Sequence, residues 1–207
     1  MNILLHPTYF PGIVTFAALV QNNVSWEVWD NYQKQTYRNR CYICTDQGRH
    51  MLNIPIKHTA VNQGRQLYRD VKIDKDYPWQ RVHWKSLQIA YRSSPFFEFF
   101  EEDLLPLFTA DFKFLMDFNF STIETICDCL QIQMPAARTK KYEDTVISMK
   151  DARFLVQAKE DHPQRYKKYT QVFQQKHGFV ENLSILDLLF NEGNAALAFL
   201  EQLKIDL

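Results

Sequence analysis

The first 30 residues read as a strand, a loop, a helix and a second strand, and this order constrains the fold more than any other feature of the chain. The apolar run "NILL" at 2–5 is typical of a short buried strand, and Pro7 and Pro11 bound the loop that follows. The run "IVTFAALVQNN" at 13–23 predicts a buried helix that closes at its two asparagines, and "VSWEVW" at 24–29 predicts a second strand. Strands joined through a helix run parallel, so we expect the chain to open an α/β sheet.

A second pair of strands is predicted to form a β-hairpin. The runs "NRCYICT" at 39–45 and "HMLNIPI" at 50–56 are both typical of strands, and they flank the turn-forming "DQGR". Gly48 suits the positive φ that such a turn requires. From residue 77 onward, apolar residues recur with a helical period. We therefore predict an α/β protein whose mixed sheet, opened by the strand-loop-helix-strand unit, precedes a helix-rich C-terminal half.

The length of 207 residues fits a single domain. Hydrophobic residues make up 46% of the chain, enough to bury a core that offsets the entropy of ordering. We predict one domain over 1–207, with an α/β part at about 1–75 and a helix-rich part at about 76–207. The run "KHTAVNQGRQLYRD" at 57–70 has no clear period, and its length makes it a candidate for a mobile lid.

The charge balance argues against general nucleic-acid binding, because 24 basic residues are matched by 24 acidic ones. Local binding through the basic stretches "RTKKYEDT" and "HPQRYKKY" is the less favoured alternative. The N-terminus lacks the parts of a secretory signal, and no run of about 18 apolar residues occurs. We therefore expect a cytoplasmic protein with no membrane span. The sequence gives no indication of its oligomeric state.

Four cysteines raise the alternative of a zinc site: Cys41, Cys44, Cys127 and Cys129. Residues three apart in a strand point to opposite faces, and residues two apart in a helix do not share a face. We therefore predict no metal site and expect buried, reduced thiols.

Several catalytic signatures are missing from the sequence. It contains no G-x-G-x-x-G, P-loop, H-E-x-x-H or G-x-S-x-G motif, which disfavours dinucleotide, P-loop and zinc-protease chemistry. With only 5 glycines, the chain would hold a phosphate through side chains and a helix N-terminus more than through a glycine-rich loop. The cofactor, if there is one, is unknown from the sequence.

The densest polar stretch is "NYQKQTYRNR" at 31–40. Arg38 and Arg40 share one face of an extended chain, so their guanidinium groups together suit a phosphate or a carboxylate. Tyr37, between other polar residues, can stack on a base or sugar ring. The alternative is a solvated hairpin edge whose charges prevent strand pairing.

Two histidines are candidates for proton transfer, since an imidazole titrates near neutral pH. His83 lies four residues after Trp79 on a predicted helix, where the alternative is a buried histidine packed between tryptophans. His6 ends the first strand, and with Thr8 and Tyr9 it reaches the carboxyl edge of the sheet, where open α/β sheets bind ligands. The alternative is that Pro7 and its neighbours only shape a strand-to-helix turn.

Taken together, four segments in this order resemble the WbqC-like protein family. They are "HPTYFP", "NYQKQTYRNR" with the hairpin ending in "IPI", "WQRVHWKSLQIAYRSSPFFEFF" and "NLSILDLLFNEG", and they span most of the chain. The resemblance implies a bacterial protein, in a setting of O-antigen and other surface-polysaccharide genes. It implies no defined reaction.

The resemblance also adds weight to residues within its matching segments. They are Tyr9, Pro11, Gln33, Asn39, Arg40, His83 and Tyr91. His6 departs from the family pattern, in which glutamine often precedes the proline, and this departure puts a catalytic role for His6 in doubt.

Two hypotheses from different classes follow. The first is a transferase of surface-polysaccharide synthesis that acts on a phosphate-bearing donor such as a nucleotide-linked sugar. In it, Arg38 and Arg40 hold phosphate, Tyr37 or Tyr9 stacks on the ring, and His83 moves a proton. The second is a non-catalytic protein that binds a glycan precursor or a partner enzyme. It predicts an apolar or aromatic surface and no deep pocket lined by Arg40 and His83.

Overall fold

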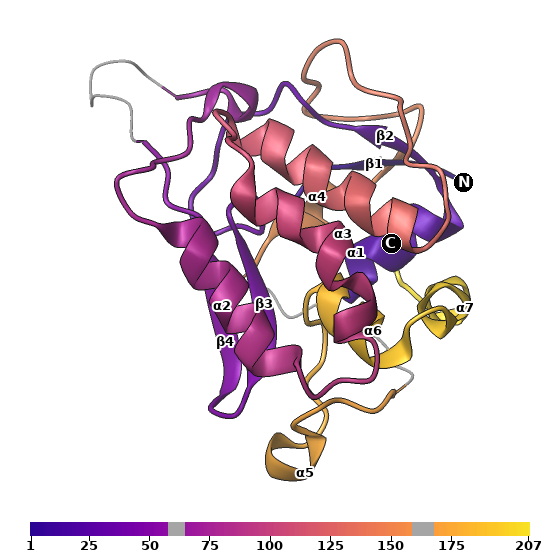
Figure 1. The fold of residues 1–207 in the computed structure, drawn as a ribbon. Helices are drawn as coiled ribbons and strands as arrows, with labels where there is room; N and C mark the ends of the chain where they lie inside the picture. Colours follow the sequence, from indigo (N-terminus) through magenta and orange to yellow (C-terminus); the bar gives the residue numbers. More distant parts are fainter. Residues whose placement is uncertain (58–64, 159–167) are drawn as a thin grey trace.

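A computed structural model describes residues 1–57, 65–158 and 168–207. Its central element is a three-stranded parallel sheet in the order β2-β1-β5, of which Figure 1 shows β1 and β2 side by side. β1 (Asn2–Leu5) lies between β2 (Asn23–Trp26) and β5 (Lys150–Asp151). The two predicted strands are confirmed, although β2 ends at Trp26 and leaves Glu27 beyond it. β5 was not predicted, because a strand of two residues shows no alternation.

α1 (Ile13–Gln21) connects β1 to β2, as predicted. Its residues from Ile13 to Leu19 are all buried, which explains why the sequence shows an apolar run and no amphipathic pattern. The helix closes at Asn22, whose extended backbone leads into β2. α6 and α7 pack against α1.

The predicted hairpin is confirmed as β3 (Arg40–Thr45) and β4 (Gly48–Asn53). Gly48 has a φ of 97°, a left-handed value that glycine adopts without steric cost. The hairpin forms a two-stranded antiparallel sheet of its own, separate from the parallel one. Parallel and antiparallel strands thus both occur in the α/β fold, which agrees with the predicted fold class.

The helices are concentrated after residue 78, also as predicted. They are α2 (Trp79–Tyr91), α3 (Phe97–Thr109), α4 (Leu115–Cys129), α5 (Gln174–His177), α6 (Ile185–Glu192) and α7 (Ala195–Gln202), with single 3₁₀ turns at η1 (Tyr68–Asp70) and η2 (Arg153–Val156). Figure 1 shows α2, α3 and α4 together on one side of the molecule, in front of the two sheets. One continuous apolar core joins the helices and both sheets.

Two sequence-based expectations fall partly outside the described residues. The lid candidate at 57–70 includes residues 58–64, and "HPQRYKKY" at 162–169 includes 162–167. The stretch "RTKKYEDT" at 138–145 is described and carries Tyr142 of the site below. In the part of the chain that the structure describes, no helix combines the length and apolar composition needed to cross a bilayer.

Candidate functional site

Polar side chains from all three parallel strands meet where these strands end. His6 directly follows β1, Glu27 and Asp30 follow β2, and Asp151 and Arg153 lie at the end of β5. The strands are parallel, so their carboxyl ends lie at one edge of the sheet, the edge at which open α/β sheets bind ligands. This edge carries the candidate site.

His6, Asp30 and Arg38 form a buried cluster at this edge. Arg38 Nη2 donates to Asp30 Oδ2 at 2.6 Å and contacts His6 Nε2 at 3.0 Å, while His6 Nε2 lies 3.3 Å from Asp30 Oδ2. Arg38 has no exposed surface. Asn119 fixes the chain here by donating from Nδ2 to the Arg38 carbonyl. The cluster therefore joins the end of β1 to residues 30–38, and Asn119 ties both to α4.

The imidazole of His6 is neutral near neutral pH. Burial lowers its pKa well below the usual value, and the positive charges of Arg38 and Arg153 lower it further. The backbone carbonyl of Glu27 raises this pKa to a lesser extent, although it does not reach hydrogen-bond geometry with Nδ1. A guanidinium only donates hydrogen bonds, so Nε2 accepts from Arg38 and the ring proton lies on Nδ1. Nδ1 is buried and has no hydrogen-bond partner among the described residues.

Arg153 organises the other side of the site. Its Nε and Nη2 donate to the Asp151 carboxylate at 2.9 and 2.6 Å, and its Nη1 and Nη2 donate to the carbonyls of Glu143 and Asp144 at 2.9 and 3.0 Å. Hydrogen bonds from Arg153 lower the pKa of the Asp151 carboxyl. Nη1 also lies 3.8 Å from Oε2 of the buried Glu27. Arg153 thereby holds the segment that carries Tyr142 against the ends of the strands.

The cluster lines a small cavity, named the inner cavity because it contains these three buried side chains, and this cavity adjoins a larger one, named the outer cavity. The inner cavity has a volume of about 190 Å³ and is lined by His6, Asp30, Gln33, Arg38, Tyr142, Arg153, Phe154, Val156 and Gln157. The outer cavity has a volume of about 500 Å³ and is lined by Asp30, Asn31, Tyr32, Gln33, Arg65, Tyr142 and Asp144. The two share Asp30, Gln33 and Tyr142, so they form one stepped site. His6, Gln33 and Arg38 are the sequence-predicted residues that it brings together.

His83 and Tyr9 form a second, separate pair. Tyr9 Oη lies 3.0 Å from His83 Nδ1, and both side chains are buried. The His83 ring packs edge-on against Trp79 and stacks on the Tyr9 ring. Neither Tyr9 nor His83 lines the stepped cavity. Burial lowers the pKa of His83 to about 4.

Acidification is expected to destabilise the protein through His83. The unfolded chain takes up a proton near pH 6.5, whereas the folded chain does so only near pH 4, so between these values the unfolded state binds more protons. Stability from His83 is therefore fully present above pH 6.5 and is lost as the pH falls, by about 2 kcal/mol at pH 5. Urea unfolding of the wild type and of His83→Asn at pH 7 and pH 5 measures it. A His83 ring that titrates near pH 6.5 by NMR would contradict this expectation.

The remaining predicted residues lie in structural contacts. Tyr91 Oη donates to Asp187 Oδ1 at 2.7 Å, and Asn39 Nδ2 donates to the Ile54 carbonyl at 2.9 Å. Tyr37 is bonded through its backbone to Tyr9 and Val156, and its ring packs edge-on against Tyr42. Arg40 begins β3, is half-buried and does not line either part of the stepped cavity. The structure thus places Arg38 and Arg40 in different surroundings.

Sequence reasoning missed much of the site. Glu27 was placed inside a strand, and Asp30 and Tyr142 were not singled out. Asp151 and Arg153 belong to a stretch that shows no periodicity. One signal could have found Glu27 and Asp30: they follow the second strand as His6 follows the first, and parallel strands end at the same edge.

The four cysteines are free thiols, and Cys41, Cys44 and Cys127 are buried as expected. Burial raises the pKa of Cys44 to about 11 and the pKa of Cys127 to about 12, so these thiols are poor nucleophiles at neutral pH. Among the described residues, no three His, Cys, Asp or Glu side chains are arranged to hold a metal ion.

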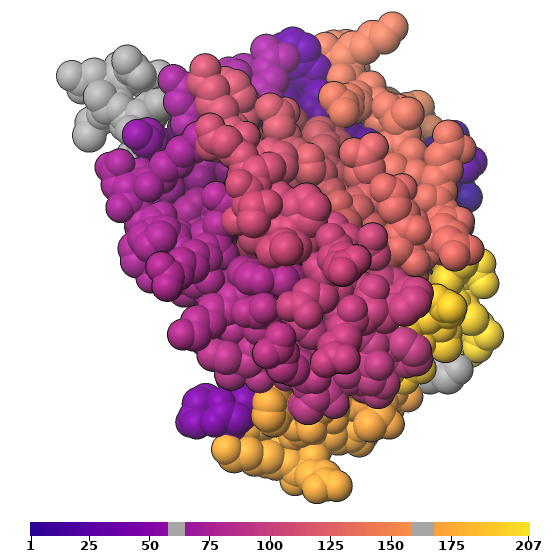
Figure 2. Space-filling view, in the orientation of Figure 1, coloured from indigo at the N-terminus to yellow at the C-terminus, as the bar shows by residue number. Residues whose placement is uncertain are grey.

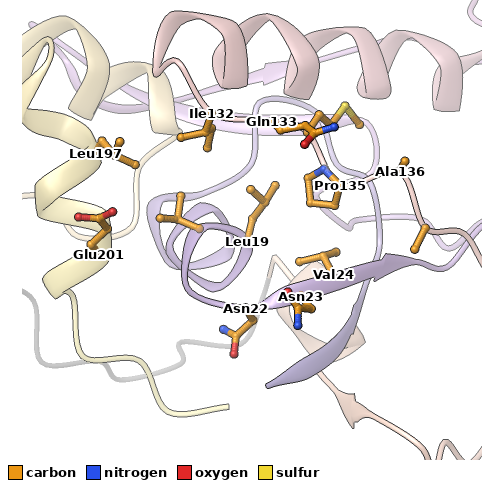
Figure 3. Close-up of a pocket in the computed structure, with 13 residues that line it drawn as sticks. Leu19, Asn22, Asn23, Val24, Ile132, Gln133, Pro135, Ala136, Leu197 and Glu201 are labelled. Carbon is orange, nitrogen blue, oxygen red and sulfur yellow. The ribbon is translucent and has the colours of Figure 1, made fainter.

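A second cavity lies at the opposite, amino edge of the sheet (Figure 3). It has a volume of about 440 Å³ and lies between the end of α1, the start of β2, residues 132–137 and α7. Its lining includes Leu19, Val24 and Ile132, and Glu201 is its one ionisable side chain among the described residues. This cavity is larger than the inner cavity at the carboxyl edge, but no described lysine, arginine or histidine lines it, and Glu201 has no second ionisable group of the described chain beside it. The stepped cavity is therefore the candidate functional site.

Comparisons with known proteins agree with the resemblance seen in the sequence. The model of the WbqC-like protein family matches residues 6–162 and 150–199. An uncharacterized protein of Mycobacterium tuberculosis, Rv1507c, is 27% identical over 113 residues, which make up 54% of this chain and 48% of that protein. The match thus spans about half the length of that relative. No solved structure matches the chain. Because the family match covers most of the chain, from His6 past Arg153, the chain belongs to the WbqC-like protein family.

Proposed function

We propose that this chain is a transferase of bacterial surface-polysaccharide synthesis, such as O-antigen synthesis, and that its donor is a nucleotide-linked sugar or a related phosphate ester. One observation carries the proposal: a neutral imidazole, a carboxylate and two guanidinium groups line a cavity at the carboxyl edge of a parallel sheet. Such groups can move a proton and stabilise developing negative charge.

In the inner cavity, His6 is the group proposed to accept a proton, at Nε2, once a substrate hydroxyl has replaced Arg38 as the donor to this nitrogen. A base must be neutral before it acts, and burial together with Arg38 and Arg153 keeps the imidazole neutral. Asp30 Oδ2, 3.3 Å from Nε2, would stabilise the imidazolium that forms. Arg38 is already bonded to Asp30, so it acts here as a positioning residue for Asp30 and His6.

The outer cavity is proposed to bind the donor. Tyr32 and Tyr142 line it and offer aromatic faces for a base or a sugar ring. Arg65 also lines it, is exposed, and has no ion pair or hydrogen bond with another described residue. An arginine with a free guanidinium fork suits a phosphate better than Arg38, whose charge Asp30 already balances. The proposal therefore places the phosphate beside Arg65.

Arg65→Ala is expected to weaken donor binding about tenfold, because it removes charge-assisted hydrogen bonds to phosphate. Nucleoside diphosphates and nucleotide sugars are first screened by thermal shift, since a ligand at about a hundred times its Kd stabilises the fold by about 2.7 kcal/mol. Calorimetry with the best ligand then compares wild type, Arg65→Ala and Arg49→Ala. Arg49 is an exposed arginine on the hairpin, outside the site, and serves as the matched control.

Three outcomes separate the hypotheses. Binding that Arg65→Ala weakens and Arg49→Ala does not, with turnover of the donor, supports the transferase. The same binding without turnover in the presence of acceptor sugars supports the non-catalytic binding protein. No response from any phosphate-bearing ligand contradicts both the proposed donor and the proposed role of Arg65.

A further inference from the structure

Exposed apolar side chains are concentrated on the hairpin formed by α2 and α3. Ten large apolar side chains are exposed among the described residues, and four of them lie on α2 and α3: Val82, Ile89, Phe99 and Leu105. Ile89 and Phe99 are 69% and 68% exposed, although both are helical and each could have been replaced by a polar residue. A concentration of this kind on one pair of helices indicates an interaction surface.

The same two helices carry opposite charges. α2 has Arg81 and Lys85, is followed by Arg92, and contains no acidic residue. α3 has four acidic residues and no basic one: Glu98, Glu101, Glu102 and Asp103. Arg81, Lys85, Glu98, Glu102 and Asp103 are all exposed.

Contacts within the hairpin use only one side of each helix. Gln80 Nε2 donates to the Leu107 carbonyl at 3.1 Å, and Gln88 Nε2 donates to Glu101 Oε1 at 2.9 Å, so the helices run antiparallel. Arg92 and Glu101 form the only ion pair between them in the described structure, at 3.9 Å. The other charges of the hairpin have no ion-pair partner among the described residues. They are available to a second molecule.

We propose that the α2–α3 face is a homodimer interface in which α2 of each copy packs on α3 of the other. Figure 2 shows this face at the front of the molecule, where no other described segment covers it. A second copy of the chain is complementary to this face. Each copy presents one basic helix, one acidic helix and exposed apolar side chains, so the basic helix of either copy can pair with the acidic helix of the other.

Symmetry and charge together select the arrangement. A two-fold axis that lies between the helices and parallel to them brings the basic α2 of one copy onto the acidic α3 of the other, twice. An axis across the helices brings α2 onto α2 and α3 onto α3, which juxtaposes like charges and costs several kcal/mol. Within one copy, the hydrogen bond between Gln88 and Glu101 shows which residues of α2 and α3 lie at the same position along the hairpin. A two-fold axis parallel to the helices keeps these positions. Lys85 of one copy therefore lies near Asp103 of the other.

Charge reversal tests the arrangement by sedimentation velocity and light scattering over a range of protein concentrations. The wild type is expected to be a dimer that weakens between about 0.05 M and about 0.5 M salt. Arg81→Glu with Lys85→Glu makes both helices acidic, whereas Glu102→Lys with Asp103→Lys leaves α3 without net charge and places two positive charges at the level of Lys85 of the other copy. Each double variant is expected to be at least a hundredfold weaker in self-association. An equimolar mixture of the two is expected to restore a dimer of mixed composition.

The controls keep the test decisive. Lys72→Glu reverses an exposed lysine outside the hairpin and is expected to leave the dimer unchanged. Because all the substituted side chains are exposed, circular dichroism and thermal unfolding should show intact folds. A monomeric wild type, a double variant that stays dimeric, or a mixture that fails to associate would each overturn the proposal. Donor binding at the carboxyl edge is measured separately, so failure of this proposal does not bear on the proposed function.

Discussion

Replacing Arg38 with methionine is expected to lower the free energy of unfolding by about 3–5 kcal/mol. The substitution leaves the Asp30 carboxylate, which is 9% exposed, without the guanidinium that lies 2.6 Å from it. It also removes the hydrogen bond that His6 Nε2 accepts and the positive charge over the Tyr68 ring. Methionine fills much of the same volume, so the loss reports the uncompensated charge more than an empty cavity. Urea unfolding at neutral pH gives the value.

The double variant Arg38→Met, Asp30→Leu separates charge from packing. With both charged groups gone, no buried charge is left unpaired, and most of the lost stability should return. A double variant as unstable as Arg38→Met alone would show that the guanidinium matters through packing and its contacts with His6 and Thr36. If Arg38→Met lowered the free energy of unfolding by less than about 1 kcal/mol, the ion pair between Arg38 and Asp30 would contribute no more than a surface pair, which would contradict this prediction.

The sequence predicts those helices and strands whose boundaries are set by residues within or next to the element itself. β1, α1 and β2 follow from an apolar run, two prolines and an Asn pair, and the hairpin follows from Gly48 in a short polar turn. The start of α6 is also local: Ser184 Oγ accepts from the Leu186 backbone N–H at 3.3 Å, and Gly193 ends the helix with a φ of 54°.

The candidate site depends on contacts that no local pattern encodes. His6 can be singled out because it follows β1, and Arg38 because it belongs to the polar stretch that precedes β3. Their partners Asp30 and Arg153 become recognisable only once β2 and β5 lie on either side of β1. β5 pairs through two residues of each strand, so its place in the sheet is set by tertiary packing more than by strand propensity.

Residue type alone also fails to distinguish functional from structural polar groups. Tyr9 and His83 lie in segments that the sequence singles out for function. In the structure, however, their side chains are buried against each other, although they are 74 residues apart in the chain. Phe118 packs on the Tyr9 ring and Trp79 on the His83 ring. Arg38 and Arg40 share a face in an ideal extended strand, but Arg38 precedes β3 and turns inward to Asp30, whereas Arg40 begins the hairpin. The departure from a strand at residue 38 decides which arginine reaches the site.

Asp187→Leu is the second substitution expected to have a large effect, a loss of about 3–5 kcal/mol in the free energy of unfolding. The buried Asp187 carboxyl accepts hydrogen bonds from Tyr91 Oη at 2.7 Å, Tyr169 Oη at 2.5 Å and Gln171 Nε2 at 3.1 Å. Leucine matches its size but leaves these buried donors without their acceptor. The network connects residues 169–171 and α2 to α6, so its loss weakens the packing of all three segments.

Tyr91→Phe is the matched control, because it removes one hydroxyl from the same network and keeps the ring packed on Phe190. We expect it to cost about 1–2 kcal/mol, since Asp187 keeps two donors while the Cys44 backbone N–H loses an acceptor. Denaturant unfolding of both variants, with the donor titration repeated on Tyr91→Phe, separates two roles for this tyrosine. Reduced stability with unchanged donor affinity means that Tyr91 supports the fold. Unchanged stability with weakened binding would contradict the structural role and return Tyr91 to the binding site that the sequence suggested.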